Sequence, residues 1–182
     1  MEKKKYPRHL DVVSFARDAI GLKGEGNLAD WPRLAEEQFD SALSPGPMLW
    51  QMQGRMVPQP GGTDEIWLDL KASVRLPMQC QRCLTPVLEV VAAERSFRFV
   101  ADEATAAALD DEAEDDILAI SRDFDALALI EDELILSLPL VPLHEICPET
   151  VPMSAVDPGF DAASERPNPF GILAGLKTGL PK

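Results

Sequence analysis

The 182-residue sequence has little of several residue types, and each shortage excludes a class of protein. It has three cysteines, an odd number that argues against a disulfide framework and fits a reducing compartment. It has no run of about 18 apolar residues, so it predicts no membrane span. The basic N-terminus has no continuous apolar stretch behind it and does not read as a secretory signal. We therefore expect a cytoplasmic protein.

Groups that commonly carry catalysis are also scarce. There are two histidines, His9 and His144, and no Gly-x-Ser-x-Gly, Gly-x-x-x-x-Gly-Lys or Gly-x-Gly-x-x-Gly motif. Carboxylates are abundant, but most lie in one acidic run where nothing in the sequence fixes their geometry. The sequence therefore favours a binding protein without a catalytic site.

What the sequence has in excess is negative charge, and that charge is concentrated in one segment. Residues 101–150 contain fifteen acids and one base, Arg122, which accounts for the whole formal net charge of −14. The densest part, Asp102–Asp116, has eight acids and no base. Such a surface attracts basic proteins and repels phosphate backbones. We predict that this run, with the carboxylates of the helix after it, binds a basic partner; the alternative is a solvated loop that binds nothing. The acids assigned to the partner are Asp110, Asp111, Glu112, Glu114, Asp115 and Asp116.

Apolar periodicity predicts an α+β fold. Ile66–Leu76 alternates apolar and polar side chains, as a half-buried strand does, and 48–57 and 87–100 are two further strand candidates, the last with a bulge at Ala92-Ala93. Because these strands are neighbours in the chain, we expect an antiparallel sheet, either a meander or a partly closed barrel. Apolar residues spaced by three and four over Asp123–Leu138 predict an amphipathic helix packed on that sheet.

Three segments make up the chain, and we expect them to form one domain. Residues 1–45 read as a helical N-terminal segment, with one helix near Leu10–Ile20 and another over Trp31–Phe39. Residues 46–150 are the β-rich core, with a Cys-x-x-Cys hairpin, the acidic loop and the amphipathic helix. Residues 151–182 are a loop and a short C-terminal helix.

The C-terminal helix is predicted to dock on another surface. Asn168 is a good cap and Pro169 a good first helical residue, and Phe170, Leu173 and Leu176 recur every three residues. A helix of about ten residues is too short to be stable alone. It must therefore pack on its own domain or on a partner.

The sharpest local motif is a pair of cysteines, Cys80 and Cys83, with a second pair of candidate ligands, His144 and Cys147. Together they form the pattern Cys-x2-Cys…His-x2-Cys, a complete Cys3His set for tetrahedral zinc. One alternative is a redox pair, which the flanking prolines and β pattern disfavour. Another is three reduced cysteines packed as small apolar groups, with the histidine hydrogen-bonded nearby.

Direct contact with RNA is a further possibility. Phe97 lies between two arginines and is placed to stack on a base. No recognisable nucleic-acid module is present. The candidate RNA contacts are Lys3, Lys4, Lys5, Arg95 and Arg98.

Three blocks of sequence resemble the bacterial YceD family, whose members are called large ribosomal RNA subunit accumulation proteins. The blocks, in order, are Cys80–Pro86, Glu131–His144 and Pro167–Lys177. The resemblance implies a role in accumulating large-subunit ribosomal RNA, through its processing or through subunit assembly. Taken with the acidic run, it leads us to expect that the chain binds a basic ribosomal protein or a pre-50S particle and no small-molecule substrate. It carries over no established activity or binding site. The alternative that it leaves open is an enzyme or a direct RNA-binding cofactor of precursor rRNA maturation.

Overall fold

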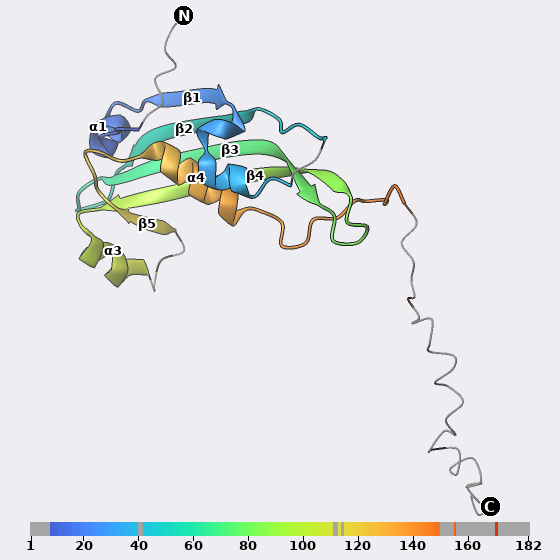
Figure 1. Cartoon of the computed structure of the whole chain (residues 1–182). Helices are drawn as coiled ribbons and strands as arrows, with labels where there is room; N and C mark the ends of the chain where they lie inside the picture. Colours follow the sequence, from blue (N-terminus) through green and yellow to red (C-terminus); the bar gives the residue numbers. More distant parts are fainter. Residues whose placement is uncertain are drawn as a thin grey trace, which may run out of the picture. The chain divides into compact units, whose positions relative to one another are not determined.

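The most regular alternation in the sequence forms strand β3 (Glu65–Gln79), the central strand of a five-stranded sheet in a computed structural model of the protein (Figure 1). Leu68, Leu70 and Leu76 are buried on one face of β3, whereas Asp69 and Lys71 lie on the other. This two-residue period is the one that a half-buried strand requires. The predicted strand is confirmed.

The structure describes residues 8–39, 42–110, 113, 115–149, 155 and 170. Residues 1–147 form one compact unit and residues 148–182 a second one. Within the described residues, no helix has the length and apolar character needed to cross a membrane.

The sheet is mixed and open. Strands β1 (Gly21–Gly26), β2 (Met48–Val57), β3 and β4 (Pro86–Val100) form an antiparallel meander, and β5 (Asp116–Ala119) is added parallel to β4. A parallel neighbour needs a crossover connection, and helix α3 (Glu103–Asp110) lies in that connection. The α+β class is confirmed, but the sheet is neither wholly antiparallel nor closed. The predicted bulge at Ala92-Ala93 is absent, since the β3–β4 register passes through both residues without a break.

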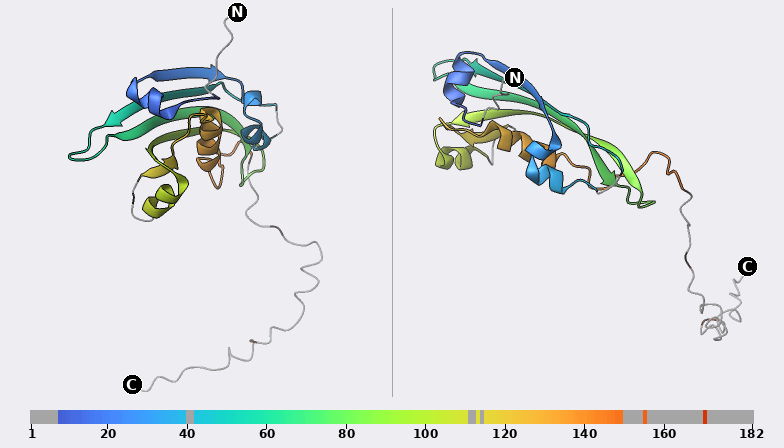
Figure 2. Two further views of the ribbon diagram at one scale, coloured as in Figure 1. Left: turned by 90° about the vertical axis from the view of Figure 1, so that its left-hand side faces the viewer. Right: turned by 45° about the horizontal axis from the view of Figure 1, so that its top comes forward.

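Helices α1 (Val12–Arg17), α2 (Pro32–Glu36) and α4 (Ala126–Leu136) cover one face of the sheet (Figures 1 and 2). Ile130 and Leu134 of α4 are fully buried in the same apolar cluster as Phe15 of α1. Asp125 caps α4 by accepting backbone N–H groups of its first turn. The apolar stripe of α4 therefore holds the two layers together.

The N-terminal segment is not all helical, because β1 and a 3-10 turn, η1 (Leu28–Asp30), lie between α1 and α2. β1 carries three glycines and no β-branched residue, so its sequence has little strand propensity. Pairing with β2 forms the strand instead. Gly24 is needed there because a Cβ would come within 2.3 Å of the Trp50 ring.

The acidic run is not a simple loop. Asp102 accepts the backbone N–H of Thr105 (2.7 Å) at the start of α3, and the run ends where β5 begins at Asp116. Asp110, Asp115 and Asp116 are exposed, whereas Asp111, Glu112 and Glu114 lie outside the described residues. The predicted acidic loop is thus replaced, over its first half, by a helix.

The carboxylates in the middle of α4 have internal partners. Glu131, which is buried, accepts the backbone N–H groups of Arg33 (2.8 Å) and Leu34 (3.1 Å), and so caps α2 from a distant element. Arg33 also pairs through its guanidinium with Glu131 and Asp132. Glu133 lies 3.5 Å from the guanidinium of Arg95 on β4. Our expectation that these carboxylates add to a partner-binding surface was therefore wrong for Glu131, and ion pairs within the chain hold the other two.

The cap on α2 gives a stability prediction. Trp31 at the N-cap position makes no side-chain capping bond, so α2 depends on Glu131. We expect Glu131→Gln to lower the free energy of unfolding by about 2 kcal/mol, because buried N–H groups lose a charged acceptor. Asp132→Asn is the matched control and should cost less than about 1 kcal/mol, because its ion pair is half exposed. Urea unfolding of both variants measures the difference, and equal losses would contradict the capping role.

Candidate metal centre

The first two candidate ligands lie in the hairpin turn between β3 and β4. Cys80 follows β3 directly, and its N–H donates to the carbonyl of Thr85 (3.0 Å) just before β4. The N–H of Leu84 donates to the carbonyl of Cys80 (2.8 Å), and Leu84 adopts a left-handed conformation with φ of 60°. This tight turn brings the Cys83 side chain back beside Cys80, as metal-binding hairpins do.

The other two ligands come from the extended segment after α4. The carbonyl of Pro142 accepts the N–H of Gln81 (2.9 Å), which ties this segment to the hairpin turn. The N–H of Leu143 donates to the Glu89 carboxylate (3.3 Å) on β4. These bonds place the segment against the hairpin where His144 follows.

Among the described residues, one group of metal-ligating side chains converges, and it consists of Cys80, Cys83, His144 and Cys147. The ligand atoms all lie within 4.8 Å of one another. In tetrahedral zinc sites with bonds of about 2.3 Å to sulfur and about 2.0 Å to nitrogen, neighbouring ligand atoms are about 3.6–3.8 Å apart. The Cys83 sulfur and the His144 Nδ1 are 3.4 Å apart, close to that spacing. The four residues therefore fit a divalent ion with small adjustments.

His144 is oriented for ligation through Nδ1. Its Nε2 lies 3.0 Å from the carbonyl of Pro86 and donates its proton there, which leaves the Nδ1 lone pair facing the sulfurs. A ligating histidine usually makes such a bond with its other ring nitrogen, because the bond fixes the tautomer and the ring plane. No pattern in the sequence marks Pro86 as part of the site, although the residue is in the first family block.

Local hydrogen bonds favour thiolates at the hairpin. Burial opposes ionisation of Cys80, but N–H groups of Cys83, His144 and Arg82 outweigh it and lower the pKa of Cys80 to about 5. The hydroxyl of Thr85, 3.1 Å from the Cys83 sulfur, is the main cause that lowers the pKa of that thiol. Hydrogen bonding to Cys80 raises the pKa of His144, and burial raises the pKa of Cys147. Two of the three thiols are thus prepared as anionic ligands.

Chemically, the arrangement suits a structural ion. Four protein ligands close a tetrahedral site, whereas a catalytic zinc site keeps a position open for water or substrate. A redox Cys-x-x-Cys pair is typically found at the start of a helix, and this pair lies in a β-hairpin. Simple thiol packing suits Cys80, which is fully buried, but Cys83 and Cys147 are only half-buried.

The predicted RNA contacts are not brought together in the described residues. Phe97 is 2% exposed and faces the core, so it is not available to stack on a base. Arg98 pairs with Glu65 (3.2 Å), whereas the Arg95 side chain is more accessible although it lies near Glu133. Lys3, Lys4 and Lys5 lie outside the described residues. RNA contact through these lysines and arginines stays a prediction.

The predicted C-terminal docking helix also stays a prediction. Asn168, Pro169, Leu173 and Leu176 lie outside the described residues, and Phe170 is described and exposed.

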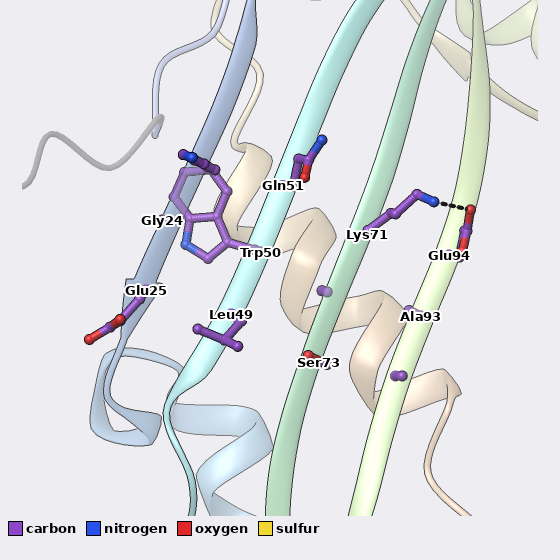
Figure 3. A pocket seen from close by; sticks show the side chains of 12 residues that line it. Gly24, Glu25, Leu49, Trp50, Gln51, Lys71, Ser73, Ala93 and Glu94 are labelled. Atoms are coloured by element: carbon purple, nitrogen blue, oxygen red, sulfur yellow. Dashed lines mark ion pairs between the residues drawn. The ribbon is translucent and has the colours of Figure 1, made fainter.

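The face of the sheet away from α4 carries a shallow pocket of about 730 Å³ (Figure 3). Binding pockets are usually concave and apolar, with a few polar groups that converge on the ligand. Here the amine of Lys71 and the carboxylate of Glu94 pair with each other at 2.5 Å. Because those charges satisfy one another, we assign no ligand to this pocket.

Comparisons with a family model and with known proteins agree. Residues 68–177 match the family model described as Large ribosomal RNA subunit accumulation protein YceD. A Haemophilus influenzae protein with that same name is 34% identical over 181 residues, which cover 97% of this chain and 99% of the relative. No solved structure matches the chain. The chain therefore belongs to the YceD family, as its three sequence blocks predicted.

Proposed function

We propose that this protein is a non-catalytic factor that supports the accumulation of large-subunit ribosomal RNA. It does so by binding a basic ribosomal protein or an immature large subunit in the cytoplasm. The main support for this proposal is the similarity, over nearly the full length, to a relative named for large ribosomal RNA subunit accumulation. The closed ligand set of the metal centre supports a binding role over an enzymatic one, since it leaves no open position for a substrate.

We further propose that Cys80, Cys83, His144 and Cys147 hold zinc. Zinc is favoured because three thiolates and an imidazole are borderline-soft ligands, whereas magnesium and calcium prefer oxygen. Bound zinc would link the hairpin turn to the segment after α4, two regions about sixty residues apart. Free energy of metal binding at such a site adds to the stability of the folded state.

The zinc proposal predicts the metal content of the purified protein. Protein prepared without added zinc should contain about one zinc ion per chain, and Cys83→Ser or His144→Asn should bring that ratio close to zero. A chelator should lower the melting temperature of the wild type but not of these variants. Glu145→Gln, at an exposed neighbour of His144, is the control that should keep both values. If the wild type contains almost no zinc per chain and a chelator leaves its melting temperature unchanged, the zinc proposal is wrong and the cysteines are simply packed thiols.

The acidic run is the proposed contact for a basic partner. Of the six acids assigned to the partner, Asp110, Asp115 and Asp116 are described, and all three are exposed without an ion-pair partner among the described residues. Such a one-sided field steers a cationic protein and opposes RNA at the same place. RNA contact, where it occurs, is therefore expected at Lys3–Lys5 or at Arg95 and Arg98.

Neutralising the run tests this contact. We expect replacement of its six assigned acids by Asn or Gln to weaken recovery of basic ribosomal proteins and to lower the level of large-subunit RNA in cells that lack the native copy. Binding of the wild type should fall steeply with salt, because the Debye length is about 8 Å at 0.15 M. A control variant neutralises exposed acids elsewhere, at Asp18, Glu36, Glu37 and Asp64. If the six-fold variant keeps normal partner recovery and normal levels of large-subunit RNA, the acidic run is only a solvated segment that binds no partner.

We also propose that Asn168–Lys177 is a docking element, on the basis of its apolar spacing. Deletion of the residues from Arg166 onward distinguishes docking on a partner from docking within the chain. Loss of partner recovery with an unchanged melting temperature indicates docking on the partner, and a lowered melting temperature indicates docking within the chain. A deletion without either effect would contradict the proposal.

A further inference from the structure

Large aliphatic side chains are exposed around the Cys3His cluster. Leu140 is 99% exposed, Ile146 85% and Leu84 62%. Single exposed leucines are common on protein surfaces, but several together mark an interaction site. Five exposed aliphatic residues lie near the ligands in the chain. Three of them directly adjoin a ligand: Leu84, Leu143 and Ile146. The other two, Leu140 and Val141, lie on the segment that leads to His144.

These side chains stand on backbone that the site itself holds in place. Leu84 lies directly after the ligand Cys83, and its N–H is bonded to the carbonyl of Cys80. Ile146 directly precedes the ligand Cys147. Val141 directly precedes Pro142, whose carbonyl accepts the N–H of Gln81. We name Leu84, Leu140, Val141, Leu143 and Ile146 the knuckle patch, and its rigid support favours a preformed docking surface.

The charge beside the knuckle patch favours a cationic partner. Three thiolates around the proposed divalent ion would leave the site with one net negative charge. Glu89 and Glu145 add two negative charges. Arg82, which directly precedes Cys83, is the one arginine or lysine next to a ligand in the chain, and it offsets one of these charges. A surface that is apolar and weakly negative repels phosphate, so it does not suit RNA.

We propose that the knuckle patch binds an aliphatic segment of a basic protein, flanked by lysine or arginine residues. This proposal rests on the proposed function and names the contact through which the protein holds its partner. This contact is separate from the acidic run. The acidic run ends at β5, which pairs with the last four residues of β4 (Figure 1). The hairpin turn lies at the opposite end of β4, next to its first residue, Pro86. The two contacts differ in salt dependence, because apolar burial is not screened.

The occupant can be identified by photo-crosslinking. A photoreactive phenylalanine analogue is placed at position 140, or at position 49 as the control, in the full chain in cells that lack the native copy. Leu49 is also exposed, but on the sheet face away from α4. We expect position 140, and not position 49, to crosslink to one basic protein identified by mass spectrometry. A crosslink to RNA, a crosslink to a second copy, or equal products at both positions would overturn the proposal.

The affinity of that purified protein then tests the energetics. Leu140→Ser combined with Ile146→Ser should weaken binding at least about tenfold, with zinc content and melting temperature unchanged. The loss should persist at high salt, unlike the loss caused by neutralising the acidic run. Leu49→Ser combined with Ile20→Ser is the matched control and should bind as the wild type does.

A cellular readout separates this proposal from the proposed function. If removal of the gene leaves large-subunit RNA unchanged, the proposed function fails. If removal lowers that RNA and the Leu140→Ser, Ile146→Ser variant restores it fully, only the knuckle patch proposal fails.

Discussion

The long antiparallel pairing of β3 with β4 is the constraint on which the rest of the structure depends. Its register runs without a break from Ile66 opposite Phe99 to Gln79 opposite Pro86. Side chains of both strands pack in the core beneath α1 and α4. At the end where Ile66 faces Phe99, β5 pairs with β4. The other end continues to the turn that carries Cys80 and Cys83. A single pairing therefore sets both the position of the core and the position of the candidate metal centre.

Helix α4 connects these two ends through side chains that serve different purposes. Leu127, Ile130 and Leu134 bury its apolar face against the sheet. Glu131 caps α2, so the helix also fixes the N-terminal segment. Because α4 is fixed along its length, the segment that follows Leu136 leaves it at a defined place. His144 and Cys147 reach the hairpin from there.

The candidate metal centre and several exposed aliphatic residues lie together beside the hairpin turn between β3 and β4. The hydrogen bonds from Gln81 to Pro142 and from His144 to Pro86 hold the two ligand pairs together. On the same segment, nonpolar side chains such as Leu140 and Ile146 are exposed, so they lack the stability that burial would give. A protein that binds a partner has a use for such residues, whereas an isolated enzyme domain does not require them. This part of the chain therefore suits the binding role that we propose.

The sequence by itself determined the elements whose pattern is local. Alternation defined β3, three-four spacing defined α4, and the ligand types in two Cys- and His-containing pairs indicated a Cys3His set, because each depends on neighbours within a few residues. Only the tertiary structure decided that glycine-rich β1 is a strand, that β5 is parallel, and that Glu131 is a cap. Those outcomes depend on partners far along the chain, such as β2 for β1 and Arg33 for Glu131. Tertiary folding also decided the convergence of Cys80 and Cys83 with His144 and Cys147, since about sixty residues separate the pairs and no local rule fixes such a distance.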